Sequence, residues 1–130
     1  MGRILVVDDH ADTCRVMMRL LRARGHEADC AYSGEEALAR LGEGTPAVPP
    51  LPDVVLLDAM MPGVDGVEVL RRLRADPNTA DVPVVMCSAV SDPAYMEHAL
   101  AKGANDYLIK SKFDVDELLR RLGPYLERAG

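Results

Sequence analysis

Residues 53–66, DVVLLDAMMPGVDG, decide how the rest of the sequence is interpreted. Four apolar residues, from Val54 to Leu57, run directly into one acid, Asp58, and a Pro-Gly loop follows. A short continuous apolar run of this kind is typical of a strand that is covered on both faces. Because burying an unpaired carboxylate is costly, Asp58 needs a partner, a solvent edge or a chemical role.

Strand-like runs recur on both sides of this stretch, with helical patterns between them. The predicted strands are 4–7, 28–32, 54–57, 82–87 and 107–109. The first helical pattern places Val16, Met17, Leu20 and Leu21 on one face and ends at Gly25, a residue suited to a helix C-cap. Three later helices are predicted to begin at capping boxes: Ser33 with Glu36, Asp65 with Glu68, and Asp114 with Glu117.

The alternation of five strands with helices predicts an α/β fold. It indicates a doubly wound parallel sheet with helices on both faces and right-handed crossovers. Two segments interrupt the pattern. Residues 42–52, GEGTPAVPPLP, are predicted to form a long exposed loop, more readily a surface insertion than a docking loop. Gly123-Pro124 is predicted to kink or restart the last helix.

Length and composition favour one domain over residues 1–130. The net charge of -6 argues against nucleic acid as the main partner. Neither a membrane-length apolar run nor a secretory signal is apparent, which predicts a cytoplasmic protein without a membrane partner. Cys14, Cys30 and Cys87 lie in apolar segments, and we expect small buried hydrophobic residues rather than a disulfide or a metal site.

Polar side chains stand at the carboxyl ends of four predicted strands. Asp8 and Asp9 follow the first strand, Asp58 follows the third, Ser88 the fourth and Lys110 the fifth. In open parallel sheets, ligands bind beyond the carboxyl ends of the strands. The sequence therefore predicts that these side chains converge at one edge of the sheet.

The converging groups suit phosphoryl chemistry. Crowded carboxylates raise one another's pKa values unless positive charge intervenes, and Lys110 and a Mg²⁺ ion are the expected sources. A carboxylate such as Asp58 can attack phosphorus and form an acyl phosphate. Lys110 and the Ser88 hydroxyl would then bind the phosphoryl oxygens. His10 lies beside the acid pair, but hard oxygen ligands suit Mg²⁺, so a loop histidine is the preferred interpretation.

The sequence resembles the receiver domain of bacterial two-component response regulators (the CheY-like superfamily) over essentially its whole length. The motifs that carry the resemblance are VVDD (6–9), LLDAMMPGVDG (56–66), CSA (87–89) and KGANDYLIK (102–110). The resemblance implies a five-stranded parallel sheet of order 2-1-3-4-5 in a (βα)5 sandwich. It also implies a phosphorylation-dependent signalling switch that controls partner binding, rather than a classical enzyme.

The resemblance assigns a role to each site residue. Asp58 would accept the phosphoryl group from a sensor histidine kinase or a phosphotransfer protein. Mg²⁺ would be held by the carboxylates and one backbone carbonyl, from Asp8, Asp9, Asp58 and Met60. Ser88 would be the switch hydroxyl and Tyr107 the switch aromatic. Lys110 would bind phosphate, and Met60 and Val90 would flank the approach of water.

The resemblance also implies where partners bind. The face formed by the fourth helix, the fifth strand and the fifth helix, around Tyr95, His98 and Lys102, would contact a downstream protein or a second, phosphorylated copy. One departure concerns Ser111, because the family usually has proline after the lysine, often through a cis bond. A cis bond before a non-proline residue costs about 2.5–4 kcal/mol, so a trans bond is predicted.

Two other functions were weighed against the switch. Haloacid-dehalogenase-like phosphatases need an acid two residues after the nucleophile, and this position is Met60. Flavin-binding flavodoxin-like proteins place a Ser/Thr-rich loop after the first strand, and here that loop, DDHADTC, is acidic. Neither the kinase, the downstream target nor the choice between a stand-alone receiver and a piece of a longer chain follows from these residues.

Overall fold

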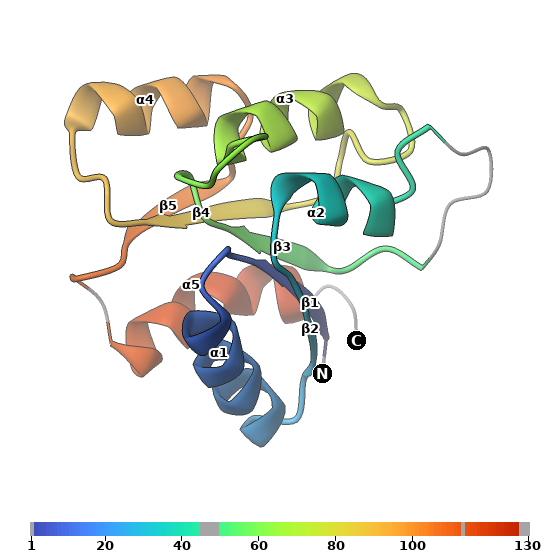
Figure 1. The fold of residues 1–130 in the computed structure, drawn as a ribbon. Helices are drawn as coiled ribbons and strands as arrows, with labels where there is room; N and C mark the ends of the chain where they lie inside the picture. Colours follow the sequence, from blue (N-terminus) through green and yellow to red (C-terminus); the bar gives the residue numbers. More distant parts are fainter. Residues whose placement is uncertain (1, 45–49, 113, 128–130) are drawn as a thin grey trace.

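Five strands alternate with five helices along the part of the chain that the computed structural model describes, which is residues 2–44, 50–112 and 114–127 (Figure 1). The elements in chain order are β1 (Arg3–Val7), α1 (Ala11–Ala23), β2 (Glu27–Ala31), α2 (Gly34–Arg40), β3 (Val54–Leu57), α3 (Gly66–Ala75), β4 (Val84–Ser88), α4 (Pro93–Ala101), β5 (Asp106–Ile109) and α5 (Val115–Glu127). The predicted strands are all present: β3 has the predicted ends, and the other four differ from the prediction by one or two residues at an end.

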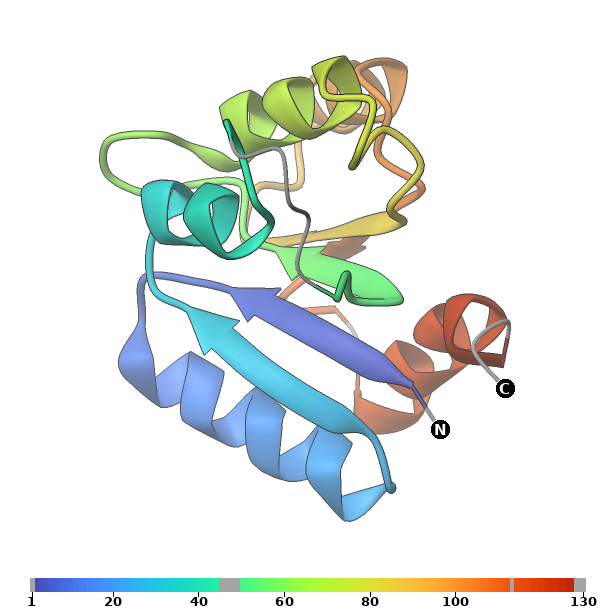
Figure 2. The same ribbon diagram turned by 90° about the vertical axis from the view of Figure 1, so that its right-hand side faces the viewer.

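The strands form one parallel sheet in the order β2-β1-β3-β4-β5, which confirms the predicted order 2-1-3-4-5. Helices α1 and α5 cover one face, and α2, α3 and α4 cover the other (Figures 1 and 2). Each face has its own apolar core. β3 is buried along its whole length, as its unbroken apolar run predicts.

The apolar face of α1 differs from the predicted one. Cys14 and Leu21 are buried, and Met17 and Met18 pack against the core, whereas Val16 is 56% exposed. The buried positions follow the spacing i, i+3, i+4 and i+7, which defines one stripe of a helix. The sequence-based choice of Val16 was wrong because it started the stripe on the wrong residue.

The three capping boxes are confirmed at their N-cap positions. The backbone N–H groups of the third helical residues donate to the cap side chains, from Glu36 to Ser33 Oγ at 3.0 Å, from Glu68 to Asp65 Oδ1 at 2.9 Å, and from Glu117 to Asp114 Oδ1 at 2.8 Å. Gly25 has φ 87°, as expected of a residue that ends a helix in the left-handed region. The starts of these three helices are therefore determined by residues that are close together in the sequence.

Two of the three cysteines contradict the sequence-based expectation. Cys14 of α1 and Cys30 of β2 are joined by a disulfide, with Cα atoms 6.1 Å apart. Cys87 is a free, buried thiol as predicted, and burial raises its pKa to about 12. The pairing was missed because the 16-residue separation says nothing until α1 is folded back against β2.

The two predicted interruptions have different outcomes. α5 continues through Pro124 to Glu127, so the predicted restart at Gly123-Pro124 is wrong. Residues 45–49 of the predicted exposed loop lie outside the described residues. Of the remainder, Pro50 is exposed while Leu51 packs against the core. Within the described ranges, every helix is too short or too polar to cross a membrane.

Candidate functional site

The carboxyl edge of the sheet is held in place by backbone hydrogen bonds that continue the strand pairing by one residue. The N–H of Asp58 donates to Val7 O at 2.9 Å, and that of Asp8 donates to Ala31 O at 3.1 Å. The N–H of Lys110 donates to Ser88 O at 2.8 Å. Because the sheet itself positions these residues, their side chains share one edge, as the sequence predicts.

Lys110 bridges the two buried acids of this edge. Its Nζ donates to Asp8 Oδ2 at 2.6 Å and lies 3.5 Å from Asp58 Oδ2. Asp8 is 3% exposed and Asp58 is 5% exposed, so both carboxylates are largely removed from water. A single ammonium group therefore faces two buried carboxylates, with Asp9 next to them.

Burial and charge shift the acid–base behaviour of this pair. Burial raises the pKa of Asp58, Lys110 lowers it, and Asp8 raises it further, so the net direction is upward. Burial opposes the charge on Lys110, but its hydrogen bond to Asp8 and the charge of Asp58 outweigh burial and raise its pKa. Lys110 is thus a fixed positive charge, and its one charge does not balance the acids.

The residues present fit a hard divalent cation. Asp9 Oδ1 is buried and has no hydrogen-bond partner among the described residues. Atoms of Asp8, Asp9, His10 and Asp58 that can bind a metal all lie within 4.8 Å of one another. Mg²⁺ binds carboxylate oxygens and retains waters, and an orphaned carboxylate oxygen beside two others meets that need. The imidazole of His10 also belongs to this cluster, which the sequence analysis did not expect.

The predicted switch residues lie on the next two strands. Ser88 is fully buried, and its Oγ accepts a hydrogen bond from Val90 N at 3.2 Å. The hydroxyl of Tyr107 donates to Val90 O at 2.9 Å, and its ring meets that of Tyr95 edge-on, 6.4 Å between centroids. Tyr107 is only 6% exposed, so it already faces inward in this structure.

The loop after β5 has the predicted trans geometry. The described peptide bonds, Lys110–Ser111 among them, contain no cis bond. Lys110 nevertheless reaches both buried acids. A proline after the lysine is therefore not required to direct its ammonium group to the site.

The fold, the strand order and the site geometry are those of one family, and comparison with known proteins identifies it. A family model described as the response regulator receiver domain matches residues 4–123. The chain belongs to this family. The receiver spans about half the length of the first curated relative that it matches.

That relative is the phosphate regulon transcriptional regulatory protein PhoB of Rhizobium meliloti. It is 39% identical over 127 residues, which are 98% of this chain and 53% of the relative. The receiver domain of the Francisella response regulator 1452 superposes with a TM-score of 0.86 at 28% identity, covering 100% of both chains.

A second similar structure holds a metal. The receiver domain of the sensor histidine kinase PA1611 of Pseudomonas aeruginosa has a magnesium ion coordinated in its active-site cleft. It is 29% identical, has a TM-score of 0.81, and the alignment covers 95% of this chain and 96% of that one. In this chain, the residues at the corresponding edge of the sheet that could hold a metal are Asp8, Asp9, His10 and Asp58.

Sequence reasoning missed a glycine that the site depends on. A Cβ on Gly66 would lie 2.3 Å from Asp58 O and 2.7 Å from Ala59 Cα, which are backbone atoms. The N–H of Gly66 also donates to Ala59 O at 2.9 Å. The start of α3 therefore packs directly on the loop that carries Asp58. The Asp65-Gly66 pair indicates a turn in the sequence. It does not indicate that the backbone of Asp58 and Ala59 lies against Gly66.

Arg74 was also missed, because in the sequence it is one of several arginines on a helix. Its guanidinium donates to the carbonyl oxygens of Gly103 at 2.9 Å and Val82 at 2.7 Å, and to Asn105 Oδ1 at 3.0 Å. These bonds tie α3 to the loops before β4 and β5. Arg74 thus holds together two strands that carry Ser88 and Lys110.

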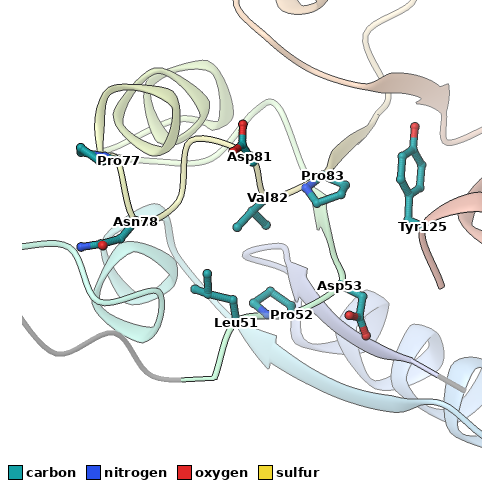
Figure 3. A pocket seen from close by; sticks show the side chains of 9 residues that line it. All are labelled: Leu51, Pro52, Asp53, Pro77, Asn78, Asp81, Val82, Pro83 and Tyr125. Carbon is teal, nitrogen blue, oxygen red and sulfur yellow. The ribbon is translucent and has the colours of Figure 1, made fainter. Parts of the chain in front are cut away.

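A hollow of about 330 Å³ lies at the opposite end of the sheet, beside the amino ends of β3 and β4 (Figure 3). Its lining is a mixture of prolines, apolar groups and two acids: Leu51, Pro52, Asp53, Pro77, Asn78, Asp81, Val82, Pro83 and Tyr125. Asp53 accepts a hydrogen bond from the backbone of Arg3 at 2.7 Å, so it is used structurally. This hollow is therefore not where the reactive groups converge.

Proposed function

We propose that this receiver is a phosphorylation-dependent switch in which Asp58 accepts a phosphoryl group from a partner histidine kinase or phosphotransfer protein. The observation that supports it best is the arrangement of Lys110, which lies 2.6 Å from Asp8 and 3.5 Å from Asp58. A buried carboxylate beside a fixed ammonium and an acidic pair is suited to nucleophilic attack on phosphorus.

In the proposed step, a carboxylate oxygen of Asp58 attacks the phosphorus of a phosphohistidine. The P–N bond breaks, its electron pair stays on the imidazole nitrogen, and that nitrogen takes up a proton. Lys110 is placed to bind one oxygen of the transferred group, and the Ser88 hydroxyl another. Bound by Asp8, Asp9, Asp58 and the Met60 carbonyl, Mg²⁺ would neutralise charge on the phosphoryl oxygens.

The signal would leave through the face formed by α4, β5 and α5. A phosphoryl group offers strong acceptor oxygens, and the Ser88 hydroxyl is free to leave Val90 N for one of them. Val90 O is bonded to Tyr107, so movement of this loop reaches β5 and the neighbouring Tyr95. The surface around Tyr95, His98 and Lys102 would then bind a protein target or a second phosphorylated copy.

The proposal covers residues 1–130 as one receiver domain that acts in the cytoplasm through protein contacts. Its chemistry is limited to its own phosphorylation and dephosphorylation. The acidic charge of -6 favours protein partners over nucleic acid for this domain. A phosphatase acting on external substrates lacks its general acid, since Met60 stands where that acid is needed.

Labelling with acetyl phosphate tests the proposal. Intact-mass measurement with Mg²⁺ should show one added phosphoryl group, which is absent without the metal. Asp58→Asn should abolish it, whereas Asp116→Asn, which removes an exposed acid of α5, should leave it unchanged. Unchanged phosphorylation of Asp58→Asn would overturn the assignment. Turnover of generic phosphate esters or flavin absorbance would point instead to the two rival functions.

A further inference from the structure

The imidazole of His10 stands among the acids of the site rather than away from them. Its Nδ1 lies 3.2 Å from Asp8 Oδ1 and 3.3 Å from Asp9 Oδ1. His10 is the N-cap of α1, but its side chain makes no capping hydrogen bond. Its position is set by the backbone, because the N–H of His10 donates to Asp8 Oδ1 at 2.9 Å.

Hydrogen bonding accounts for only one of the two contacts. Nδ1 is within hydrogen-bonding geometry of Asp8 Oδ1, but Asp9 Oδ1 has no hydrogen-bond partner although the ring nitrogen is 3.3 Å away. The ring nitrogen and the two carboxylate oxygens face one another closely enough to share one ion, or to form two ion pairs if the imidazole is charged.

The spacing suits ligands of one ion. Donors about 2.0–2.1 Å from an octahedral ion lie about 3 Å apart when adjacent and about 4 Å apart when opposite. The observed 3.2 and 3.3 Å are close to the adjacent spacing. The wider set of Asp8, Asp9, His10 and Asp58 spreads over no more than 4.8 Å, which small side-chain shifts would close.

We propose that His10 is a nitrogen ligand of the metal in this receiver, so that its site favours first-row transition ions such as Mn²⁺ and Ni²⁺ over Mg²⁺. Imidazole suits Ni²⁺, whereas Mg²⁺ prefers oxygen and Mn²⁺ lies between them, so the effect of a nitrogen ligand should be larger for Ni²⁺ than for Mn²⁺. The inference rests on the proposed metal site and specifies which ions that site selects. The solvent-exposed ring of His10, 69% exposed as a side chain, can turn toward the ion without disturbing the core.

The competing explanation is that a charged imidazole simply neutralises the two acids. The two explanations differ in what removal of the ring does. If His10 only supplies a positive charge, removing its ring should tighten the binding of all divalent ions by the same factor. If His10 is a nitrogen ligand, removing its ring should lower the affinity for Mn²⁺ and Ni²⁺ relative to that for Mg²⁺.

Calorimetric titration of the wild type and His10→Ala with Mg²⁺, Mn²⁺ and Ni²⁺ distinguishes them. His26→Ala, which removes the imidazole between α1 and β2, is the matched control. We expect His10→Ala to lower the Ni²⁺ affinity relative to Mg²⁺ by about tenfold or more, which is what loss of a supporting group alone costs a metal site, and to lower the Mn²⁺ affinity by a smaller factor. His26→Ala should leave both ratios unchanged.

Pulsed electron paramagnetic resonance of the Mn²⁺ form gives a direct second readout. Nitrogen-14 modulation from a coordinated imidazole should be present in the wild type and His26→Ala, and absent in His10→Ala. An unchanged affinity ratio with no nitrogen modulation overturns the inference, while intact Mg²⁺ binding and Asp58 labelling would leave the proposed function standing. If no divalent ion binds the wild type, the inference and the metal site of the proposed function both fail.

Discussion

Lys110 donates its hydrogen bond to Asp8 at 2.6 Å and stays 3.5 Å from Asp58. The proposed nucleophile is therefore the less well compensated of the two buried acids. Its raised pKa has burial as the main cause, with the charge of Asp8 adding to it. The fold therefore stabilises the charged form of Asp58 less well than water does.

Asp58→Asn should make the protein more stable at neutral pH in the presence of a chelator. Because the folded-state pKa of Asp58 lies above 3.8, the carboxyl favours the folded state when protonated, and this contribution is lost as pH rises through the folded pKa. The neutral amide avoids the loss. The gain should shrink as pH falls toward 3.8, because Asp58 takes up its proton at a higher pH in the folded protein than in the unfolded chain.

Urea unfolding across this pH range measures the effect. Asp116→Asn removes a charge from an exposed position and should change the free energy of unfolding by less than about 0.5 kcal/mol. If Asp58→Asn is no more stable than the wild type at neutral pH, Lys110 fully compensates the charge of Asp58.

Gly66→Ala should destabilise the protein and disturb the site together. The added methyl would meet the backbone of Asp58 and Ala59 at 2.3 and 2.7 Å, and overpacking of this kind costs about 1–3 kcal/mol. Because the displaced atoms belong to the loop that carries Asp58, labelling by acetyl phosphate should slow as well. Thermal unfolding and labelling rates check the two effects.

Gly123→Ala is the matched helical control. Nothing lies within 4 Å of a Cβ at Gly123, and an alanine there should stabilise α5 by about 0.5–1 kcal/mol. Equal effects of the two substitutions would mean that the close approach at Gly66 does not constrain the loop.

The disulfide between Cys14 and Cys30 should contribute about 3 kcal/mol to the oxidised protein, as expected for closing a loop of about this length. The variant with alanine at both positions should be less stable than oxidised wild type by about this amount, and much closer to reduced wild type. Urea unfolding with and without reductant gives the comparison. Unfolded, non-reduced protein should show one reactive thiol, Cys87, and three reactive thiols would refute the cross-link.

Much of the site follows from the sequence because it depends on strand ends. Asp8, Asp58, Ser88 and Lys110 were placed by the rule that parallel strands bring their carboxyl ends to one edge, which needs no knowledge of packing. The caps at Ser33, Asp65 and Asp114 are likewise local. Their success reflects interactions between residues three positions apart.

What the sequence did not predict depends on contacts between distant segments. The Cys14–Cys30 bond needs the docking of α1 on β2, and the Gly66 contact needs the path of the loop after β3. The sequence analysis interpreted His10 as a loop histidine from the ligand chemistry of its neighbours. The structure shows that its ring nitrogen lies close to the carboxylates of Asp8 and Asp9. Propensity overstated the break at Pro124, because α5 does not restart there and its packing on the sheet carries the helix past the proline.

The switch prediction concerns Ser88 and Tyr107. Beryllofluoride, a phosphate mimic, should draw the Ser88 hydroxyl from Val90 N and shift amide resonances around Tyr95, His98 and Lys102. Tyr107 is already buried, so its ring should become more restricted rather than move inward from solvent. Amide shifts confined to the metal pocket would contradict the coupling.

Tyr107→Phe is the matched variant for this coupling. It removes the hydrogen bond to Val90 O, worth about 1 kcal/mol, and keeps the ring beside Tyr95. The amide shifts at the α4–β5–α5 face should weaken in this variant while those in the metal pocket remain. Equal shifts in both proteins would show that the hydroxyl does not transmit the signal.

The lifetime of the phosphorylated state should depend on Met60 and Val90. An aspartyl phosphate is lost when water attacks in line, and we expect these two residues to flank this approach. The Met60 side chain is 59% exposed at the rim and, like that of Val90, cannot direct a water by hydrogen bonding. Since positioning of the attacking water is much of what a protein can contribute to phosphoryl transfer, hydrolysis should be slow.

The comparison that tests this is the phosphate-loss rate of wild type against the double variant Met60→Asn, Val90→Glu. We expect the polar variant to lose phosphate roughly tenfold faster, a modest share of what correct positioning of a reactant can contribute. The backbone of Val90 bonds Ser88 and Tyr107, so the single variant Met60→Asn guards against a disturbed switch loop. If neither variant is faster, both side chains merely pack on their loops, and the approach of water is controlled elsewhere.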